Sequence, residues 1–344
     1  MTTMKAISIK DSKGPATSLF MSEISTISSP GTNEAVVKVA AFALNRMDIL
    51  QREGLYNVPP QAPVTLGVEF SGTITAIGES ESEFQVGDKV FGLASGGAYA
   101  EYILCPIPLL IKYVEPAAVD SPLTFIASAG VPEVWFTACQ ALLTIADIQS
   151  VKPKSVLIHA GASGVGIACL QLARSLLGKD AILFATVGSD EKVKFVESVP
   201  GASFGINYRK YDYVKFISDK TGGTGVDVVV DFIGADYFAR NIAVAARDGR
   251  IVMLSLMSGA IVDKVNIGLI LAKRLRIEGS TLRSRTVEYQ TKLRNQVAEF
   301  VLPRLQSGEF VNPVDKVFSW KDIVKAHQYM ESNMSMGKII CVID

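Results

Sequence analysis

The sequence has few residues of the kinds that bind metals or form disulfides. Among 344 residues there are only two histidines, His159 and His327, and four cysteines without a CxxC pair. Ligands of a structural zinc site are closely spaced, and a disulfide framework needs paired cysteines, so we expect neither feature. We predict structural roles for both histidines. Buried free thiols are expected at Cys105, Cys139, Cys169 and Cys341.

The chain also lacks an excess of either charge and any long apolar run. Lys plus Arg and Asp plus Glu both number 34, which gives no electrostatic footprint for nucleic acid or acidic lipid. No apolar run approaches the length that spans a bilayer. The N-terminus, "MTTMKAISIK", has no apolar signal-peptide core. We expect a cytoplasmic protein without nucleic-acid or membrane partners.

The length of the chain favours two domains, because single cores rarely grow this large. Up to about Thr124, short alternating segments separated by turn residues predict a β domain. From Val131 onward, strands alternate with helices. The strand candidates are "SVLIHA", "AILFATV", "FGINY", "VDVVVDF", "RIVMLS" and "LRIEGS". Six apolar strands with helical crossovers predict an α/β fold with a doubly wound parallel sheet.

After Arg283 an amphipathic helix is expected, because apolar residues from Leu293 to Leu305 recur at three- and four-residue steps. Strand-like patterning returns in "FVNPVDKVFSW" and "GKIICVID". The simplest topology returns this C-terminal segment to the first domain. The predicted domains are 1–127 with 284–344, and 128–283.

The stretch "HAGASGVG", His159 to Gly166, predicts a dinucleotide site between the first α/β strand and its helix. Gly161, Gly164 and Gly166 stand where a tight turn, close backbone approach and helix packing are needed. A helix N-terminus with unpaired N–H groups favours a phosphate. Ser163 is small enough to admit a pyrophosphate and has a hydroxyl that can donate to it. The alternative is a tight corner without a ligand.

The end of the second strand, "TVGSDEK", favours NADPH over NADH. Gly188 leaves space, Ser189 offers a hydroxyl and Lys192 a positive charge, while Tyr208 supplies a further donor after the third strand. A site for NADH places an acid here to bind the ribose hydroxyls. The following acids at 190 and 191 are counter-evidence, unless they serve the first turn of the next helix, where acids are favoured.

Together these features resemble the zinc-free quinone oxidoreductase branch of the medium-chain dehydrogenase/reductase superfamily, and most closely its p53-inducible type. The resemblance covers nearly the whole chain. It is carried by "NRMDILQREGLYNVPP", "LGVEFSGTITAIG", "VGDKVFG", "GGAYAEY", "PEVWFTACQ", "VLIHAGASGVG", "GINYR", "GSTLRSR" and "ESNMSMGK". It implies a GroES-like β domain, a Rossmann NADPH-binding domain and an oxidoreductase activity. It also implies a homodimer joined at the Rossmann sheet edge, here "LRIEGS".

The resemblance further implies NADPH contacts at individual positions. They are Asn45 and Thr137 near the nicotinamide; Ser163, Gly164 and Val165 at the pyrophosphate; Ser189, Lys192 and Tyr208 at the 2′-phosphate; and Asn333 and Lys338 from the other domain.

One difference from the zinc-dependent relatives bears on whether the reaction needs a metal ion. Their "GHE" motif has a histidine where this chain has Val68 before Glu69, and their closely spaced cysteines are missing. Without a Lewis acid, ionising an alcohol is hard at neutral pH, whereas hydride delivery to an electron-poor acceptor needs no metal. We therefore predict a metal-free, NADPH-dependent reductase of quinones or similar carbonyl acceptors.

The stretch "NRMDILQREGLY" is expected to line the cleft of such an enzyme. Asn45 and Asp48 can hydrogen-bond cofactor or acceptor, and Tyr56 is a candidate proton donor. For Asp48 a helix cap or ion pair is the alternative, and for Tyr56 a packing role. Enoyl thioester reductases of the same superfamily place a tyrosine in this loop, so enoyl reduction is the second hypothesis. A non-catalytic NADPH-binding structural or RNA-binding relative is the third.

Overall fold

The computed structural model describes residues 3–60, 62–80, 82–114 and 123–344, which divide into two compact units. The β unit comprises Met1–Phe136 with Arg283–Asp344, and the α/β unit comprises Thr137–Leu282. The predicted boundaries were 127/128 and 283/284. The observed division at 136/137 falls within helix α3 (Pro132–Cys139), so one continuous helix supplies residues to both units.

The β unit is built on a seven-stranded sheet in the order β14-β15-β3-β4-β5-β7, with β6 also paired to β3, and on a separate hairpin of β1 and β2. The strands are β1 (Thr3–Ile9), β2 (Leu19–Ser25), β3 (Glu34–Ala43), β4 (Glu69–Ile77), β5 (Lys89–Leu93), β6 (Tyr102–Pro106), β7 (Leu110–Lys112), β14 (Val314–Ser319) and β15 (Lys338–Val342). Strand β15 pairs antiparallel with β3, so the C-terminal segment shares one sheet with the N-terminal strands.

The β unit also contains helices. They are α1 (Arg46–Arg52), α2 (Phe125–Ser128), α10 (Val287–Gln296), α11 (Leu302–Ser307) and α12 (Ile323–Glu331), with the 3-10 turns η1 (Lys10–Ser12), η2 (Ala16–Ser18), η3 (Ile107–Leu109) and η6 (Trp320–Asp322). Of these, α2 and α12 contact the sheet. The core forms where α12 meets the strands: Ile323, Ala326 and Met330 pack in one cluster with Phe42, Phe70 and other buried strand residues.

The α/β unit is a six-stranded sheet in the order β10-β9-β8-β11-β12-β13, in which every pairing is parallel. Its strands are β8 (Ser155–Ile158), β9 (Ile182–Val187), β10 (Phe204–Asn207), β11 (Val226–Asp231), β12 (Ala245–Met253) and β13 (Arg276–Gly279). Its helices are α4 (Ile148–Val151), α5 (Gly164–Leu177), α6 (Asp190–Ser198), α7 (Tyr213–Lys220), α8 (Ala235–Val244) and α9 (Gly268–Lys273).

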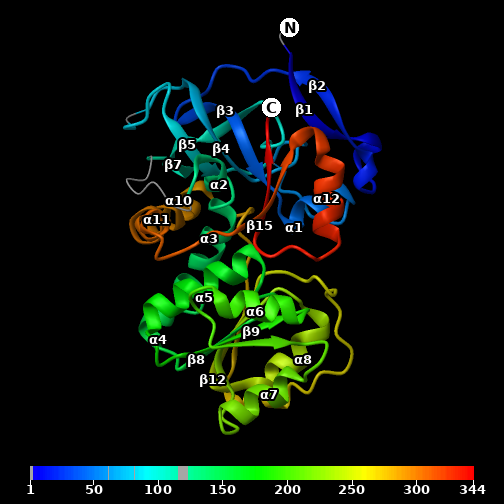
Figure 1. Cartoon of the computed structure of the whole chain (residues 1–344), viewed down its shortest axis with the longest axis vertical. Coiled ribbons are helices and arrows are strands. Elements are labelled where there is room, and N and C mark those ends of the chain that lie inside the picture. Colours follow the sequence, from blue (N-terminus) through cyan, green and yellow to red (C-terminus); the bar gives the residue numbers. More distant parts are fainter. Residues whose placement is uncertain (1–2, 61, 81, 115–122) are drawn as a thin grey trace. The chain divides into compact units, whose positions relative to one another are not determined.

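The six predicted strands are all present, and the predicted α/β class with a doubly wound parallel sheet is confirmed. Figure 1 shows helices α5 and α6 on one side of this sheet and α7 and α8 on the other. The central strand β8 is buried along its whole length, as expected for a strand covered on both faces. The carboxyl ends of β8 and β9 bring the predicted cofactor residues to one edge of the sheet.

Two helical stretches contain a π-helical segment, and one of them is the amphipathic helix predicted after Arg283. Segment η4 (Gln140–Ile145) follows α3, and η5 (Val297–Val301) separates α10 from α11. The second interruption has a local cause, because Pro303 lies in the first turn of α11 and has no N–H to donate to the carbonyl of Glu299. The wider π turn accommodates the missing hydrogen bond while the apolar stripe stays buried.

Candidate functional site

The turn after β8 ends in a helix N-terminus with free backbone donors. Ser163 is the N-cap of α5, and its Oγ accepts a hydrogen bond of 3.1 Å from the N–H of Gly166. Among the described residues, the N–H groups of Gly164 and Val165 have no partner. The cap uses the oxygen of Ser163 and leaves its hydroxyl proton free to donate. Two N–H groups and one hydroxyl at the positive end of a 14-residue helix fit a pyrophosphate.

Two of the three predicted glycines are required by packing of the turn itself. A Cβ on Gly161 would lie 2.7 Å from the Cβ of Ala185 in β9. A Cβ on Gly166 would lie 2.5 Å from the carbonyl oxygen of Ala160. Both separations are far below contact distance, so any side chain here would push α5 away from β8 and β9.

The end of β9 gathers the four residues predicted at the 2′-phosphate. Ser189 is the N-cap of α6, and its Oγ accepts from the N–H of Lys192 at 3.3 Å. A Cβ on Gly188 would lie 3.1 Å from the hydroxyl of Tyr208, which places that hydroxyl directly beside the glycine. Tyr208 keeps 40% of its surface exposed. The structure therefore brings Gly188, Ser189, Lys192 and Tyr208 to one place.

The two acids that argued against NADPH are engaged by neighbours. Asp190 accepts a hydrogen bond of 2.7 Å from the amide of Asn207 and forms an ion pair with Lys210. The hydrogen bond from Lys210 is the main reason that the pKa of Asp190 lies below its usual value. The pKa of Glu191 is also lowered, first by a backbone N–H at the start of its own helix. Both acids thus serve the first turn of α6 and its surroundings.

Both histidines lie in the interior, where they hold polar side chains together. His159 is fully buried and bonds to Thr186 Oγ1 at 2.8 Å and to Asn241 Oδ1 at 2.7 Å. Burial lowers its pKa to about 4, so the ring is neutral at pH 7.

Thr137, predicted near the nicotinamide, is also buried in α3.

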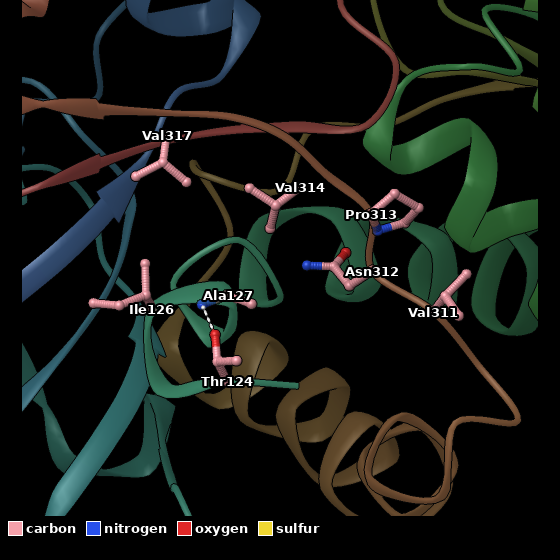
Figure 2. Close-up of a pocket in the computed structure, with 8 residues that line it drawn as sticks. All are labelled: Thr124, Ile126, Ala127, Val311, Asn312, Pro313, Val314 and Val317. Atoms are coloured by element: carbon pink, nitrogen blue, oxygen red, sulfur yellow. Dashed lines mark hydrogen bonds between the residues drawn. The ribbon is translucent and has the colours of Figure 1, made fainter. Parts of the chain in front are cut away.

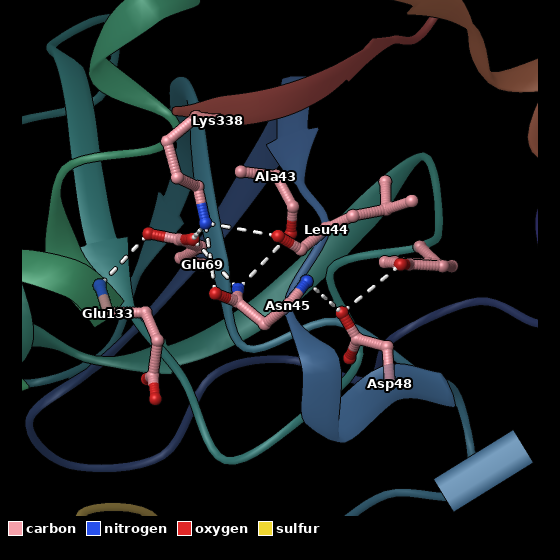
Figure 3. Close-up of polar contacts among 8 residues, drawn as sticks. Ala43, Leu44, Asn45, Asp48, Glu69, Glu133 and Lys338 are labelled. Carbon is pink, nitrogen blue, oxygen red and sulfur yellow. Dashed lines mark hydrogen bonds and ion pairs between the residues drawn. The ribbon is translucent and has the colours of Figure 1, made fainter. Parts of the chain in front are cut away.

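The β unit contains a buried polar cluster, defined here as Asn45, Asp48, Glu69, Glu133 and Lys338 (Figure 3). The Lys338 ammonium donates to Glu69 Oε1 at 2.7 Å, to Asn45 Oδ1 at 2.9 Å and to the Leu44 carbonyl at 3.0 Å. An ammonium has three protons, and all three are used here. Lys338 therefore neutralises Glu69 and positions Asn45.

Asn45 and Asp48 fix the start of α1. The Asn45 amide donates to Glu69 Oε1 at 2.8 Å, while its backbone N–H donates to Asp48 Oδ2 at 2.8 Å. Asp48 thus caps the helix, which was the structural alternative for this residue. Its other oxygen, Oδ1, is buried and makes no hydrogen bond to any described residue. Burial raises the pKa of Asp48 to about 6, although the backbone of Asn45 and the charge of Arg283 act in the opposite direction.

A chain of hydrogen bonds leads from Arg52 to Asp48. Arg52 Nη1 lies 3.2 Å from His327 Nδ1, His327 Nε2 lies 3.2 Å from the Tyr99 hydroxyl, and that hydroxyl donates to Asp48 Oδ2 at 3.2 Å. Arginine can only donate, so Nδ1 must accept, and the neutral ring carries its proton on Nε2. Burial lowers the pKa of His327 to about 3, which keeps the ring neutral. Every donor in this chain therefore points toward Asp48.

Glu133 contributes a carboxyl that is not tied to the rest of the cluster. Its backbone N–H donates to Glu69 Oε2 at 2.9 Å, while Figure 3 shows its carboxyl pointing away from Glu69 and Lys338. The residue is 7% exposed, and no described residue donates to this carboxyl. Burial, and then the charge of Glu69, raises its pKa to about 8. The neutral, protonated form of the Glu133 carboxyl is thus favoured well above the usual pKa of a glutamate.

Arg283 lies against the predicted proton donor Tyr56. The guanidinium donates through Nε to the Ser95 carbonyl and through Nη1 to Gln51 Oε1, both at 2.7 Å. Its Nη2 is buried and makes no hydrogen bond of normal geometry within the described residues. The guanidinium carbon lies 5.4 Å from the ring centroid of half-buried Tyr56. Burial raises the pKa of Tyr56, and the charge of Arg283 partly opposes that effect.

Asn333, the remaining predicted contact, follows α12 with a left-handed backbone (φ 56°). Its Oδ1 accepts a hydrogen bond of 2.6 Å from Arg46 Nη2. The predicted residues therefore form two groups. Asn45, Asp48, Tyr56, Asn333 and Lys338 lie in the β unit, and the others lie in the α/β unit.

The sequence reasoning missed Glu69, Glu133 and Arg283 as members of a polar site. Each stands in a motif that carries the family resemblance: "LGVEFSG", "PEVWF" and "GSTLRSR". The available signal was a single charge inside an otherwise apolar stretch, since such a charge is seldom buried without a partner. Which residues these charges contact could be seen only in the three-dimensional structure, because the partners are far apart in the sequence.

The described cavities lie elsewhere. One of about 310 Å³ in the β unit lies between α2 and the segment around β14, and Figure 2 shows Ile126, Pro313 and Val314 among its mostly apolar lining. A second, in the α/β unit, lies by the amino ends of β11 and β12, at the opposite sheet edge from the glycine turn. Neither is lined by a predicted site residue.

Residues 3–60, 62–80, 82–114 and 123–344 contain no group of three or more His, Cys, Asp or Glu placed to hold a metal ion. Within the same ranges, no helix has the length and apolar character needed to cross a membrane.

Comparison with known proteins identifies the family. The model of the alcohol dehydrogenase GroES-like domain matches residues 31–115, and that of the zinc-binding dehydrogenase matches 164–300. The quinone oxidoreductase of Mus musculus is 30% identical over 99% of this chain and 98% of its own length. The chain belongs to the medium-chain dehydrogenase/reductase family. Within that family it is an oxidoreductase of the quinone oxidoreductase-like branch, and the predicted GroES-like and Rossmann architecture is confirmed.

Two similar solved structures are named as enzymes with different substrates. Escherichia coli quinone oxidoreductase complexed with NADPH is 27% identical, with a TM-score of 0.81 over 98% of this chain and 100% of that one. The CurK enoyl reductase is 28% identical, with a TM-score of 0.82 over 99% of each chain. Both reaction types therefore occur on this fold at similar sequence distance.

Proposed function

We propose that this oxidoreductase is an NADPH-dependent, metal-free reductase of quinones and similar electron-poor carbonyl acceptors. The observation that carries the cofactor assignment is the group of Gly188, Ser189, Lys192 and Tyr208 at the end of β9. It offers hydroxyls and a cation where an NADH site has a carboxylate. The Escherichia coli relative of known structure is an NADPH complex, which supports the same choice.

The cofactor would be held at two places in the α/β unit. The N–H groups of Gly164 and Val165 and the Ser163 hydroxyl would bind the pyrophosphate, and the residues at the end of β9 would bind the 2′-phosphate. Bound NADPH supplies a hydride. The residues predicted near the nicotinamide, Asn45 and Thr137, stay predictions, as do the contacts from Asn333 and Lys338.

The metal-free assignment rests on which charges surround Glu69. Val68 stands where zinc-dependent relatives have a histidine, and it is buried. The Glu69 carboxylate is held by the Lys338 ammonium at 2.7 Å, so a lysine provides the positive charge beside it. Delivery of hydride to an acceptor that is already electron-poor does not require a Lewis acid. A quinone is such an electron-poor acceptor. Oxidation of an unactivated alcohol, by contrast, requires the alcohol to be ionised, which is hard without a Lewis acid.

Quinone oxidoreductases are prominent among the relatives and support the acceptor class. Enoyl thioester reduction is the second candidate, because enoyl reductases have the same fold and Tyr56 stands in the loop where a proton donor is expected. The two reactions differ in where the proton is added. A hydroquinone anion is protonated on oxygen, and an enolate is protonated on carbon.

A panel of acceptors tests the proposal. We expect NADPH to support reduction of ortho-quinones far faster than of short enoyl-CoA thioesters, and NADPH to outperform NADH. Activity should be unchanged after incubation with a chelator. Faster turnover of the thioester would select the second candidate, and loss of activity together with about one zinc per chain would overturn the metal-free mechanism. No turnover of any acceptor would favour a non-catalytic NADPH-binding protein.

We also propose a homodimer joined at strand β13, the edge of the α/β sheet. The segment that leads into this strand exposes large apolar side chains, among them Ile261 at 84%, Ile267 at 70% and Leu271 at 83%. An unpaired strand edge beside exposed apolar residues is the feature expected of a surface that pairs with a second copy.

A further inference from the structure

Glu133 and Arg283 are buried polar groups for which the fold provides no complete set of partners. Arg283 is 4% exposed, and two of its three nitrogens are fixed by Ser95 and Gln51. The third, Nη2, makes no hydrogen bond of normal geometry with any described residue, and the guanidinium lies beside Tyr56, whose pKa is raised by burial and partly lowered again by Arg283. A buried charged donor without a well-formed hydrogen bond costs free energy, and such exceptions call for a ligand or a functional explanation.

The surroundings of Glu133 are those of a proton donor. The titratable or charged groups that influence it are Glu69, Lys338, Asp48, Arg283 and Tyr56. Glu69 forms an ion pair with Lys338, and no hydrogen bond joins either side chain to the Glu133 carboxyl within the described residues. Burial and the negative charge of Glu69 both disfavour its ionised form. The protonated form of the carboxyl is therefore favoured, and no described residue accepts its proton.

We propose that Arg283 and Glu133 form the subsite for the oxygen of the acceptor, Arg283 Nη2 stabilising the oxyanion that develops and Glu133 protonating it. This inference rests on the proposed function. Tyr56, whose ring lies against the Arg283 guanidinium, would flank the acceptor and not donate the proton. Preorganised donors aimed at developing charge are among the largest contributions to catalysis.

The proton and electron balance of this step is complete. The quinone gains two electrons and one hydrogen as a hydride, which leaves a hydroquinone anion with its charge on oxygen. That oxygen accepts a hydrogen bond from Arg283 Nη2 and then the proton of the Glu133 carboxyl. Phenolic oxygens have pKa values of about 10, so transfer from an acid with a pKa of about 8 is downhill. Water returns a proton to the Glu133 carboxylate.

The first experiment compares Glu133→Gln with the wild type and with Glu288→Gln, a matched control on the exposed side of α10. For the wild type, kcat/KM for an ortho-quinone should fall as pH rises above about 8, where the Glu133 carboxyl ionises. Glu133→Gln should lower kcat/KM by ~10²–10⁴-fold, because the amide cannot donate a proton to the product. The pH profile of this variant should show no decline near pH 8. Glu288→Gln should match the wild type. Glu133→Asp should retain the decline, which keeps the test informative if the glutamine variant does not fold.

A second measurement does not depend on turnover. In infrared difference spectra, the wild type at pH 7 should show the carbonyl band of a protonated carboxyl that disappears above pH 8 and is missing in Glu133→Gln. For Arg283, the probe is 4-nitrophenol, whose phenolate absorbs in the visible. The wild type should bind it as the phenolate, and Arg283→Met should lose that absorbance change.

The outcomes separate this inference from the proposed function. Failure of the wild type to reduce any quinone would reject the function while the spectra still report on Glu133. Quinone turnover that survives Glu133→Gln within tenfold, or a carboxyl already ionised at pH 7, would overturn the proton donor. Phenolate binding that survives Arg283→Met would overturn the oxyanion site.

Discussion

At the scale of single residues, the structure shows which charged side chains are held by neighbours within each unit. The Lys338 ammonium donates three hydrogen bonds within the β unit. The Asp190 carboxylate accepts a hydrogen bond from Asn207 and forms an ion pair with Lys210. Lys192 follows the N-cap Ser189 on α6, close to Gly188 and the Tyr208 hydroxyl, and carries the positive charge predicted at the 2′-phosphate. Lys192 is therefore the residue at which cofactor choice can be tested most directly.

Lys192→Glu should abolish or reverse the preference for NADPH. A charge-assisted contact with a phosphate is worth ~1.5–3 kcal/mol, or roughly ten- to hundredfold in affinity. The measurement is the ratio of kcat/KM for NADPH and NADH. Lys194→Glu, with the same charge change two positions on, is the control and should keep the wild-type ratio. If Lys192→Glu also keeps it, or the wild type uses NADH equally well, the assignment of this site to the 2′-phosphate is wrong.

Tyr56→Phe should lower quinone turnover by less than about tenfold, below the range of a general acid. The reason is that Tyr56 shares its surroundings with Glu133, which is the stronger acid of the two and whose protonated form is favoured well above the usual pKa of a glutamate. Turnover is measured with an ortho-quinone and, in parallel, with an enoyl-CoA. Collapse of both activities would identify Tyr56 as the proton donor and favour the enoyl reductase hypothesis.

At the scale of elements, the features that could be predicted from the sequence are those determined by residues close to one another along the chain. Each strand of the α/β sheet is a short apolar run, and each glycine of the turn stands within a few residues of the groups it must approach, so both were recognisable. The buried polar cluster joins β4, α3 and β15 through residues 69, 133 and 338, and no periodicity relates positions so far apart. The π segment before Pro303 was missed for a different reason, because the apolar stripe continues through it.

Gly166→Ala tests the turn between β8 and α5. The new methyl group would meet the backbone of Ala160 and Gly161 at 2.5–2.8 Å, and backbone atoms cannot rotate away. Overpacking of this kind typically costs ~1–3 kcal/mol of unfolding free energy, and displacement of α5 should also weaken NADPH binding. Both are measurable by urea unfolding and cofactor titration.

The control is Gly268→Ala at the start of α9, where the methyl group would meet only the exposed Asn266 side chain at 3.0 Å. This variant should unfold like the wild type. Equal stability of the two glycine variants would show that the turn tolerates a side chain and that its glycines are not explained by packing.

At the scale of the whole molecule, the proposed dimer makes the sheet edge a shared surface. Ile267→Asp with Leu271→Asp should convert a dimer to a monomer, because two buried carboxylates would face the partner copy. Analytical ultracentrifugation gives the mass directly. Val64→Asp, at a position 85% exposed in the β unit, should leave the dimer intact. A wild type that sediments as a monomer at every concentration would contradict the proposal.

Stability as a function of pH offers an independent test of Glu133, because a group whose pKa differs between the folded and unfolded states makes stability depend on pH. The folded pKa of about 8 lies above the ordinary value of 4.5. Between these values the unfolded chain has lost this proton while the folded chain keeps it. The contribution of Glu133 to stability is therefore complete below pH 4.5, declines as pH rises to about 8, and stays low above that. At ~1.4 kcal/mol per pKa unit, the total decline amounts to a few kcal/mol.

Glu133→Gln removes this titration and should lose less stability than the wild type on going from pH 5 to pH 9. Asp48 shifts in the same direction, from 3.8 to about 6, but it remains in both proteins and cancels in the comparison. Urea unfolding of both proteins at pH 5, 7 and 9 gives the difference in unfolding free energy. That difference should move in favour of the variant as pH rises and level off above pH 8, whereas Glu288→Gln should show no such trend. A difference that stays constant across this range would mean that Glu133 is ionised in the folded protein at pH 7, and it could not then be the proton donor.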